Sequence, residues 1–129
     1  MDIRIYTNFT IPNSTPQQRK LGGNATHPTQ GLKYARAAWQ ALVEPYAPAT
    51  PAPKDVPIRL NVRLYYYSKT KRGFKTTRPD GDNLLKIIKD AMTRAGFWAD
   101  DAQVCAENIE RYYTNDEDYV DINVFSLKN

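Results

Sequence analysis

The most regular pattern in the chain is the run Ile58-Arg59-Leu60-Asn61-Val62-Arg63-Leu64-Tyr65-Tyr66-Tyr67. Apolar side chains alternate with polar or basic ones, and successive side chains of a β-strand point to opposite faces of the sheet. The run therefore predicts a strand with one apolar face in the core. Its other face is basic and aromatic, which sets it apart from an ordinary solvated strand face.

Two amphipathic helices are expected, one before this strand and one after it. Residues 30–43 place apolar side chains at three- and four-residue spacing, and Pro45 ends that helix. Residues 83–95 repeat the spacing, and Gly96 suits the left-handed position just past a helix end. The apolar residues are Leu32, Ala35, Trp39, Leu42 and Val43 in the first helix, and Leu84, Leu85, Ile88, Ala91, Met92 and Ala95 in the second.

Three further strands are expected near residues 3–9, 103–112 and 119–127. The last two flank the polar residues 115–118, which predict a turn of hairpin type. Loops are predicted at residues 10–28 and 68–79, and the prolines of residues 48–57 predict an extended connector. The order of elements predicts one α+β domain over residues 1–129, in which a small mixed sheet of about four strands carries both helices on one face.

Length and composition narrow the class of protein. The 129 residues include 41% hydrophobic and 25% charged residues, ordinary values for a globular domain. No apolar run approaches the roughly 18 residues of a membrane span, and the N-terminus does not resemble a secretory signal. The single cysteine, Cys105, forms no internal disulfide, so we expect a cytoplasmic protein.

Charge is segregated along the chain. Residues 1–79 carry thirteen Lys and Arg against three Asp and Glu, whereas residues 80–129 carry five against eleven. Residues 56–79 contain seven of these basic residues and no acid. Such a basic block suits a polyanion, because each contacted phosphate releases condensed counterions. A solvated basic loop that balances the acidic part explains the charge equally well. The candidates for nucleic-acid contact are Arg59, Arg63, Lys69, Lys71, Arg72, Phe74, Lys75 and Arg78.

Acidic residues form the second unusual feature. Asp82 is placed to cap the second helix, but capping does not explain Asp80 two residues earlier. Four-residue steps put Asp82, Lys86 and Asp90 on a single polar stripe of the helix. The chain then returns to Asp100-Asp101, whose carboxylates we expect at the same end of the sheet.

Clustered carboxylates predict a divalent metal ion, because they repel one another unless a cation lies between them. Oxygen ligands favour Mg²⁺ or Mn²⁺, and one His and one Cys are too few for a common zinc site. A calcium loop of EF-hand type starting at Asp80 fails, because Leu85 is its sixth residue and Ala91 its twelfth. We expect His27 in a loop and Cys105 buried in a strand, which gives nucleophilic catalysis little support.

These acidic segments resemble the signature of the RusA family of Holliday-junction resolvases. The resemblance covers residues 78–105 and implies a small homodimeric endonuclease that depends on Mg²⁺ or Mn²⁺, is often encoded in a prophage, and cuts four-way DNA junctions. The matching residues are Asp80-Gly81-Asp82-Asn83-Leu84-Leu85-Lys86, Asp90-Ala91, Ala95-Gly96-Phe97-Trp98 and Asp100-Asp101-Ala102-Gln103-Val104.

The resemblance also implies a role for each matching polar residue. Asp80, Asp82 and Asp101 correspond to the metal-site carboxylates of the family, and Lys86 corresponds to its catalytic lysine. Asp90 and Asp100 match two further acidic positions of the family, and we call them the supporting acids because their expected role is to support the residues around the metal.

The chemistry expected from these residues is paired, metal-assisted hydrolysis of phosphodiester bonds in recombination and repair. Phosphate contacts from residues 69–78 would place the DNA backbone at the metal, while Phe74, Tyr65 or Tyr67 would stack on bases unpaired at the branch point. Two alternatives stay open. One is a less selective nuclease that acts on flaps or forks, and the other is a protein that binds junctions without cutting them.

Overall fold

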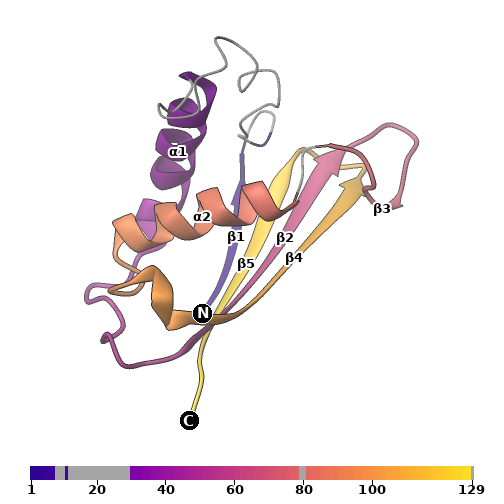
Figure 1. The fold of residues 1–129 in the computed structure, drawn as a ribbon. Coiled ribbons are helices and arrows are strands. Elements are labelled where there is room, and N and C mark those ends of the chain that lie inside the picture. The colour runs from indigo at the N-terminus through magenta and orange to yellow at the C-terminus, as the bar shows by residue number, and fades with distance from the viewer. Residues whose placement is uncertain (8–10, 12–29, 79–80, 129) are drawn as a thin grey trace.

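The structure is a computed structural model that describes residues 1–7, 11, 30–78 and 81–128 (Figure 1). A mixed five-stranded sheet has the strand order β1-β5-β2-β4-β3, in which β2 and β4 are parallel and the other neighbours are antiparallel. The strands are β1 (Asp2–Tyr6), β2 (Ile58–Tyr67), β3 (Gly73–Phe74), β4 (Val104–Thr114) and β5 (Tyr119–Ser126). The predicted α+β fold is confirmed, with one strand more than expected.

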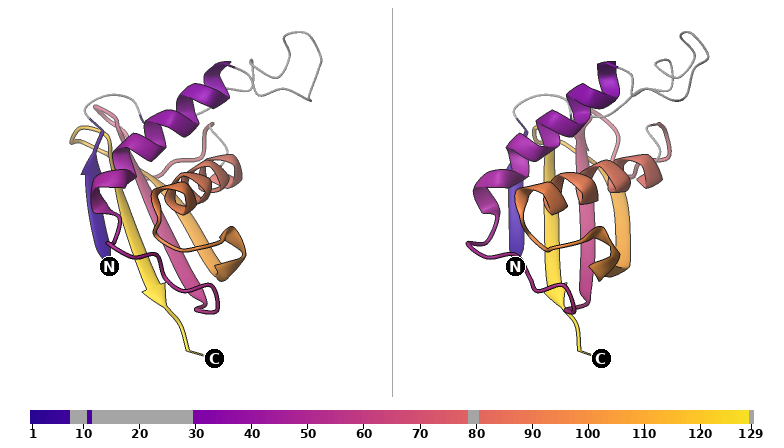
Figure 2. Two further views of the ribbon diagram at one scale, coloured as in Figure 1. Left: turned by 90° about the vertical axis from the view of Figure 1, so that its left-hand side faces the viewer. Right: turned by 60° about the vertical axis from the view of Figure 1, so that its left-hand side comes forward.

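The two helices, α1 (Gln30–Val43) and α2 (Gly81–Ala95), lie on the same face of the sheet, as Figure 2 shows. A short 3-10 helix, η2 (Glu44–Tyr46), continues α1 through Pro45. The first helix has the predicted bounds, whereas the second begins two residues earlier than expected. At the end of α2, Gly96 has a φ of 93° and the Phe97 N–H donates to the Met92 carbonyl, as its sequence position predicts.

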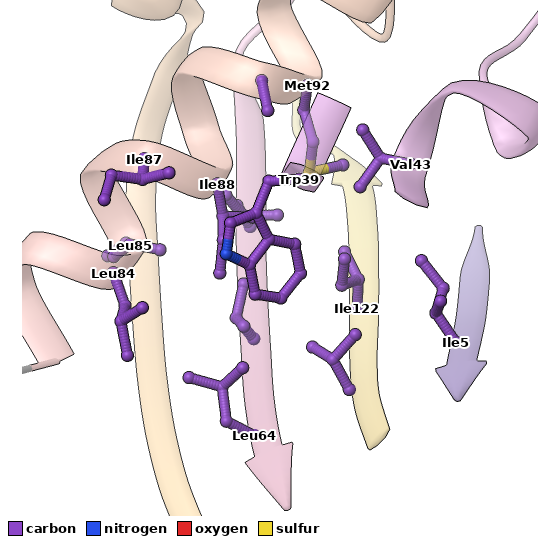
Figure 3. Close-up of a cluster of buried hydrophobic side chains, with 14 of the residues drawn as sticks. Ile5, Trp39, Val43, Leu64, Leu84, Leu85, Ile87, Ile88, Met92 and Ile122 are labelled. Carbon is purple, nitrogen blue, oxygen red and sulfur yellow. The ribbon is translucent and has the colours of Figure 1, made fainter. Parts of the chain in front are cut away.

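The core lies between the helices and the sheet. Trp39 of α1 is completely buried and lies among Ile88 and Met92 of α2 and the apolar side chains of the sheet (Figure 3). Every second residue of β2 from Ile58 to Tyr66 is buried in this layer, as the alternation predicts. No helix in the described part of the chain is long and apolar enough to cross a membrane.

The predicted hairpin between the last two strands is wrong. Strands β4 and β5 lie on opposite sides of β2, so residues 115–118 pass over the end of β2 instead of joining neighbours. Two strand spacings are about 10 Å, which four residues span easily. Asp118 fixes this turn, because its Oδ1 accepts a 2.7 Å hydrogen bond from the Tyr67 N–H at the end of β2.

Two smaller predictions also differ from the structure. Residues 73–74 form β3 inside the predicted loop, pairing with β4 in a segment too short to show any periodicity. Cys105 is exposed instead of buried, because the register shifts between Ile58 and Arg59 and leaves Cys105 as the extra residue of a bulge in β4. His27 and, apart from residue 11, the loop predicted at residues 10–28 lie outside the described residues.

The proline-rich connector before β2 is held by one buried side chain. Gln103 is 6% exposed, and its Nε2 donates to the carbonyl oxygens of Pro53 and Val56 at 2.7 and 3.0 Å. Its Oε1 accepts from the backbone N–H groups of Ala99 and Asp100 at 2.7 and 2.9 Å. Gln103 thus joins the connector to the turn that follows α2.

Candidate active site along helix α2 and the basic loop

The start of α2 carries two of the predicted catalytic side chains. Asp82 lies in the first turn and Lys86 one turn later, and both are exposed. Because the helix begins at Gly81, Asp82 is inside the first turn and not at the N-cap position predicted for it. A carboxylate there is favoured by the unpaired N–H groups and the positive end of the helix dipole.

Gly81 lets this helix start approach β4 closely. A Cβ atom added to Gly81 would lie 3.3 Å from Ile109 Cγ2 and 3.7 Å from Arg111 Nε. The Arg111 guanidinium therefore lies beside the first turn of α2, where it also donates a 2.7 Å hydrogen bond to the Thr77 carbonyl. Sequence reasoning missed Arg111, since its position beside α2 depends on the pairing of distant segments.

Asp101 lies beyond the other end of α2, in the 3-10 helix η3 (Asp101–Gln103). Its Oδ1 is hydrogen-bonded to the Thr93 hydroxyl. The same hydroxyl accepts a 2.7 Å hydrogen bond from the indole N–H of Trp98, a residue only 1% exposed. Asp101 is thus oriented by Thr93, whose hydroxyl is in turn held by the buried Trp98.

Within one chain, Asp82 and Asp101 do not share a site. Eleven residues separate Asp82 from Thr93, which corresponds to about 16 Å along the helix axis. The turn at Gly96 returns the chain only to the last turns of α2, and β4 begins directly after η3. The expectation that Asp100-Asp101 lie at the same end of the sheet as Asp82 is therefore wrong.

The metal assignment itself stays a prediction. Among the residues that the structure describes, no three His, Cys, Asp or Glu side chains come together to hold a metal ion. Asp80, the third predicted ligand, lies outside the described residues.

The two supporting acids have structural partners. Asp90 Oδ2 lies 3.4 Å from Arg94 Nε, one helical turn away. Asp100 accepts a 3.0 Å hydrogen bond from the Ala102 N–H and forms a capping box with Gln103 at the start of η3. Asp100 therefore stabilises the turn that presents Asp101.

The loop between β2 and β3 presents the basic side chains predicted from the sequence. Lys69, Lys71 and Arg72 are exposed, as is Arg78 after β3. Each of the ammonium groups of Lys71 and Lys75 lies 5.5 Å from the centre of the Tyr113 ring. A hydrogen bond with Thr77 and these two ammonium groups lower the pKa of the Tyr113 hydroxyl.

The basic residues of β2 have a different environment. Arg63 faces Asp121 on one neighbouring strand and Glu110 on the other, and its Nη2 donates to Asn123 Oδ1 at 3.2 Å. Opposite charges directly across strands offset one another. Arg59, by contrast, is exposed near the start of β2, opposite Phe125 and Ala106. The loop therefore offers phosphate the larger uncompensated positive charge.

Comparison with known proteins gives three findings. Residues 9–124 match the sequence model of the family described as Endodeoxyribonuclease RusA. A Lactococcus phage r1t protein named crossover junction endodeoxyribonuclease rusA is 40% identical over 67 residues, which are 50% of this chain and 50% of that protein. The crossover junction endodeoxyribonuclease RusA of Escherichia coli K12 is 39% identical over 49 residues, 38% of this chain and 35% of that protein. The matches thus span about half of the phage relative and about a third of the bacterial one.

Proposed function

Because the chain belongs to the RusA family of endodeoxyribonucleases, we propose that it cuts four-way DNA junctions in a reaction that requires Mg²⁺, with Mn²⁺ as a substitute. The observation that carries this proposal is the exposed start of α2, where Asp82 and Lys86 lie at the end of the acid-free basic loop. The names of the relatives supply the substrate class. We place the activity in the cytoplasm.

Each side chain has a distinct task in this proposal. Asp80, Asp82 and Asp101 would hold the metal ion, which when bound would polarise the scissile phosphate and lower the pKa of the attacking water. Lys86, on the same helix face as Asp82, stabilises negative charge that develops on the phosphate. The basic side chains of residues 69–78 hold the neighbouring phosphates and so fix the DNA backbone in register.

The distance between Asp82 and Asp101 supports a homodimer. The two carboxylates lie at opposite ends of α2, about 16 Å apart along the axis, so a single chain does not bring both to one metal ion. A two-fold symmetric pair can place Asp101 of each copy beside Asp82 of the other. Such a pair holds two equivalent sites, as two opposed cuts across a junction require.

The activity is tested with a labelled, mobile four-way junction, compared with a flap and a linear duplex, with Mg²⁺ present and with the metal chelated. We expect cleavage of the junction alone and only with Mg²⁺. Equal cleavage of the flap would favour a less selective nuclease. Tight junction binding without cleavage even in the presence of Mg²⁺ would instead favour the non-cutting junction-binding protein.

The shared site is tested by mixing two inactive variants, Asp82→Asn and Asp101→Asn. A mixed dimer keeps one site with both carboxylates if the site is shared between copies, so the mixture should regain nicking of one strand. If each site lies within one chain, every site in the mixed dimer lacks a ligand and activity stays absent. Light scattering reports whether wild type and variants are dimers under the assay conditions.

A further inference from the structure

An unbroken series of five aromatic rings crosses the sheet on the face opposite the helices. Each ring lies directly across from the next in the strand register, and the distances between neighbouring ring centres are 4.8, 5.2, 4.3 and 5.2 Å. The aromatic ladder consists of Phe74, Tyr112, Tyr65, Tyr119 and Tyr6, one residue from each strand.

The ladder decides which rings can take a further stacking partner. Tyr65 has Tyr112 on one face and Tyr119 on the other, so neither of its faces accepts a nucleobase. Phe74 is different, because β3 is the last strand of the sheet and Tyr112 is its only ring neighbour among the described residues. Phe74 is 66% exposed, the highest value among the large apolar side chains described.

Charge distinguishes Phe74 from Tyr6 at the opposite end of the ladder. Phe74 of β3 follows Lys69, Lys71 and Arg72 in a segment without acids, and Glu110 accepts a 3.0 Å hydrogen bond from the hydroxyl of its ring neighbour Tyr112. The Tyr6 hydroxyl donates to Asp116 at 3.4 Å, and Arg4 on the same strand is paired with Asp121. The Phe74 end is therefore the more positive of the two, and a polyanion is attracted to it more strongly than to the Tyr6 end. Gly73, with a φ of 81° that a residue with a side chain rarely adopts, sets the backbone direction from which Phe74 extends.

We propose that Phe74 stacks on an unpaired nucleobase at the branch point of the junction. This inference rests on the proposed function and adds a base-binding site to it. Phe74 pairs with Tyr112 of β4, and the start of α2 contacts Ile109 and Arg111 of the same strand from the other side of the sheet. Phe74 and the start of α2 therefore lie beside the same part of β4, on opposite faces of the sheet.

Stacking also has an energetic advantage at this position. Tyr112, which is itself stacked on Tyr65, holds the Phe74 ring in place before DNA arrives, so less side-chain entropy is lost on binding. A paired duplex offers no free base face, whereas the branch point does. Phe74 thereby favours junctions over linear DNA without reading the sequence.

The test is binding by Phe74→Leu, which removes the ring but keeps an apolar side chain, to an immobile junction in metal-free buffer. We expect junction affinity to fall roughly fivefold to a hundredfold, the usual effect of removing one base–aromatic stack. Affinity for linear duplex and the salt dependence should not change, since no charge is removed. Phe74→Tyr should retain wild-type affinity.

Two control variants separate stacking from general effects. Phe125→Leu removes a 43% exposed phenyl ring near the other end of the strands, and it should bind junctions like wild type. Lys71→Gln combined with Lys75→Gln should instead flatten the salt dependence by about 0.9 for each phosphate that the variant no longer neutralises, with less effect on the preference for junctions.

An abasic scan of the branch point identifies the base. At one position, repeated on the symmetry-related strand, removing the base should abolish the difference between wild type and Phe74→Leu. The proposal is overturned if Phe74→Leu binds the intact junction like wild type, or if its defect persists at every abasic position. Wild-type cleavage of the junction is measured separately, so a failure of the proposed function appears in that assay and not in this one.

Discussion

Asp82 and Asp101 have the same carboxylate side chain and lie at opposite ends of α2, but the contacts of the two side chains differ. Asp82 is exposed in the first helical turn, where only the backbone sets its direction. Asp101 is hydrogen-bonded to the Thr93 hydroxyl, which accepts a hydrogen bond from the buried Trp98. Gln103 fixes the neighbouring turn through its hydrogen bond with the Ala99 N–H. The Asp101 side chain is thus linked to the core through Thr93 and Trp98, whereas the Asp82 side chain is exposed at the surface.

The contrast shows that residues at the two ends of one helix contribute differently to stability and to function. The Asp82 side chain is exposed and has no hydrogen bond or ion pair within the described residues, so its carboxylate is available to a ligand. At the Asp101 end, the same side chains that position a carboxylate also stabilise the fold. Substitutions at the two ends should therefore have different effects on stability even where they have the same effect on cleavage.

The largest expected effect is the loss of cleavage in Asp82→Asn. The change removes one charge of the proposed metal site, so single-turnover cleavage should fall about a thousandfold or more, which corresponds to several kcal/mol less transition-state stabilisation. Junction affinity should stay the same or improve, because less negative charge faces the phosphates. Thermal unfolding should hardly change. Cleavage at the wild-type rate would remove Asp82 from the site.

The next largest expected effect is a loss of folding stability in Gln103→Ala, beyond the C-terminal end of α2. The substitution removes the partner of four part-buried backbone groups, the carbonyls of Pro53 and Val56 and the N–H groups of Ala99 and Asp100. A fully buried group left without a partner costs about 1–3 kcal/mol, and a part-buried group costs less. We expect the free energy of unfolding in urea to fall by roughly 2–4 kcal/mol. Asn83→Ala, at an exposed position near Asp82, is the matched control and should cost less than about 0.5 kcal/mol.

The sequence predicted those parts of the fold that depend on local periodicity. Alternation identified β2, and the three- and four-residue spacing identified α1 and α2, because burial on one face repeats within each element. The position of β5 beyond β2 was not predictable in this way. A four-residue polar turn suits a hairpin and a passage over one strand equally well, so the turn does not reveal which strands pair.

In the candidate site, too, some positions could be predicted from local spacing and others could not. Helical spacing correctly placed Asp82 and Lys86 on one face of α2, since that relation is local. The position of Asp101 depends on where the chain turns after Gly96, and Arg111 reaches the helix start only through the pairing of β4 with β2. Distances between segments that are remote in sequence do not follow from spacing.

A moderate effect on cleavage is expected at Thr93, which connects Asp101 to the core. Thr93→Val removes the hydroxyl that orients Asp101 and accepts from Trp98, so cleavage should fall about tenfold to a hundredfold, as is typical when a metal ligand loses its supporting partner. The Mg²⁺ concentration for half-maximal cleavage should rise. Thr93→Ser keeps the hydroxyl and should restore both values. If Thr93→Val lowered stability alone, Thr93 would be structural and not a positioning residue.

The smallest effect is expected at Asp90, between the two ends of the helix. Its carboxylate lies 3.4 Å from Arg94 Nε and both side chains are partly exposed, an arrangement worth about 0.3–0.5 kcal/mol. Asp90→Asn should therefore lower the free energy of unfolding by no more than that, and cleavage should change less than twofold. A loss comparable to that of Asp82→Asn, in a protein of unchanged stability, would mean that the metal site extends along the polar stripe of α2. The division of the helix into a ligand end and a structural end would then be wrong, because a group in its middle would also serve the reaction.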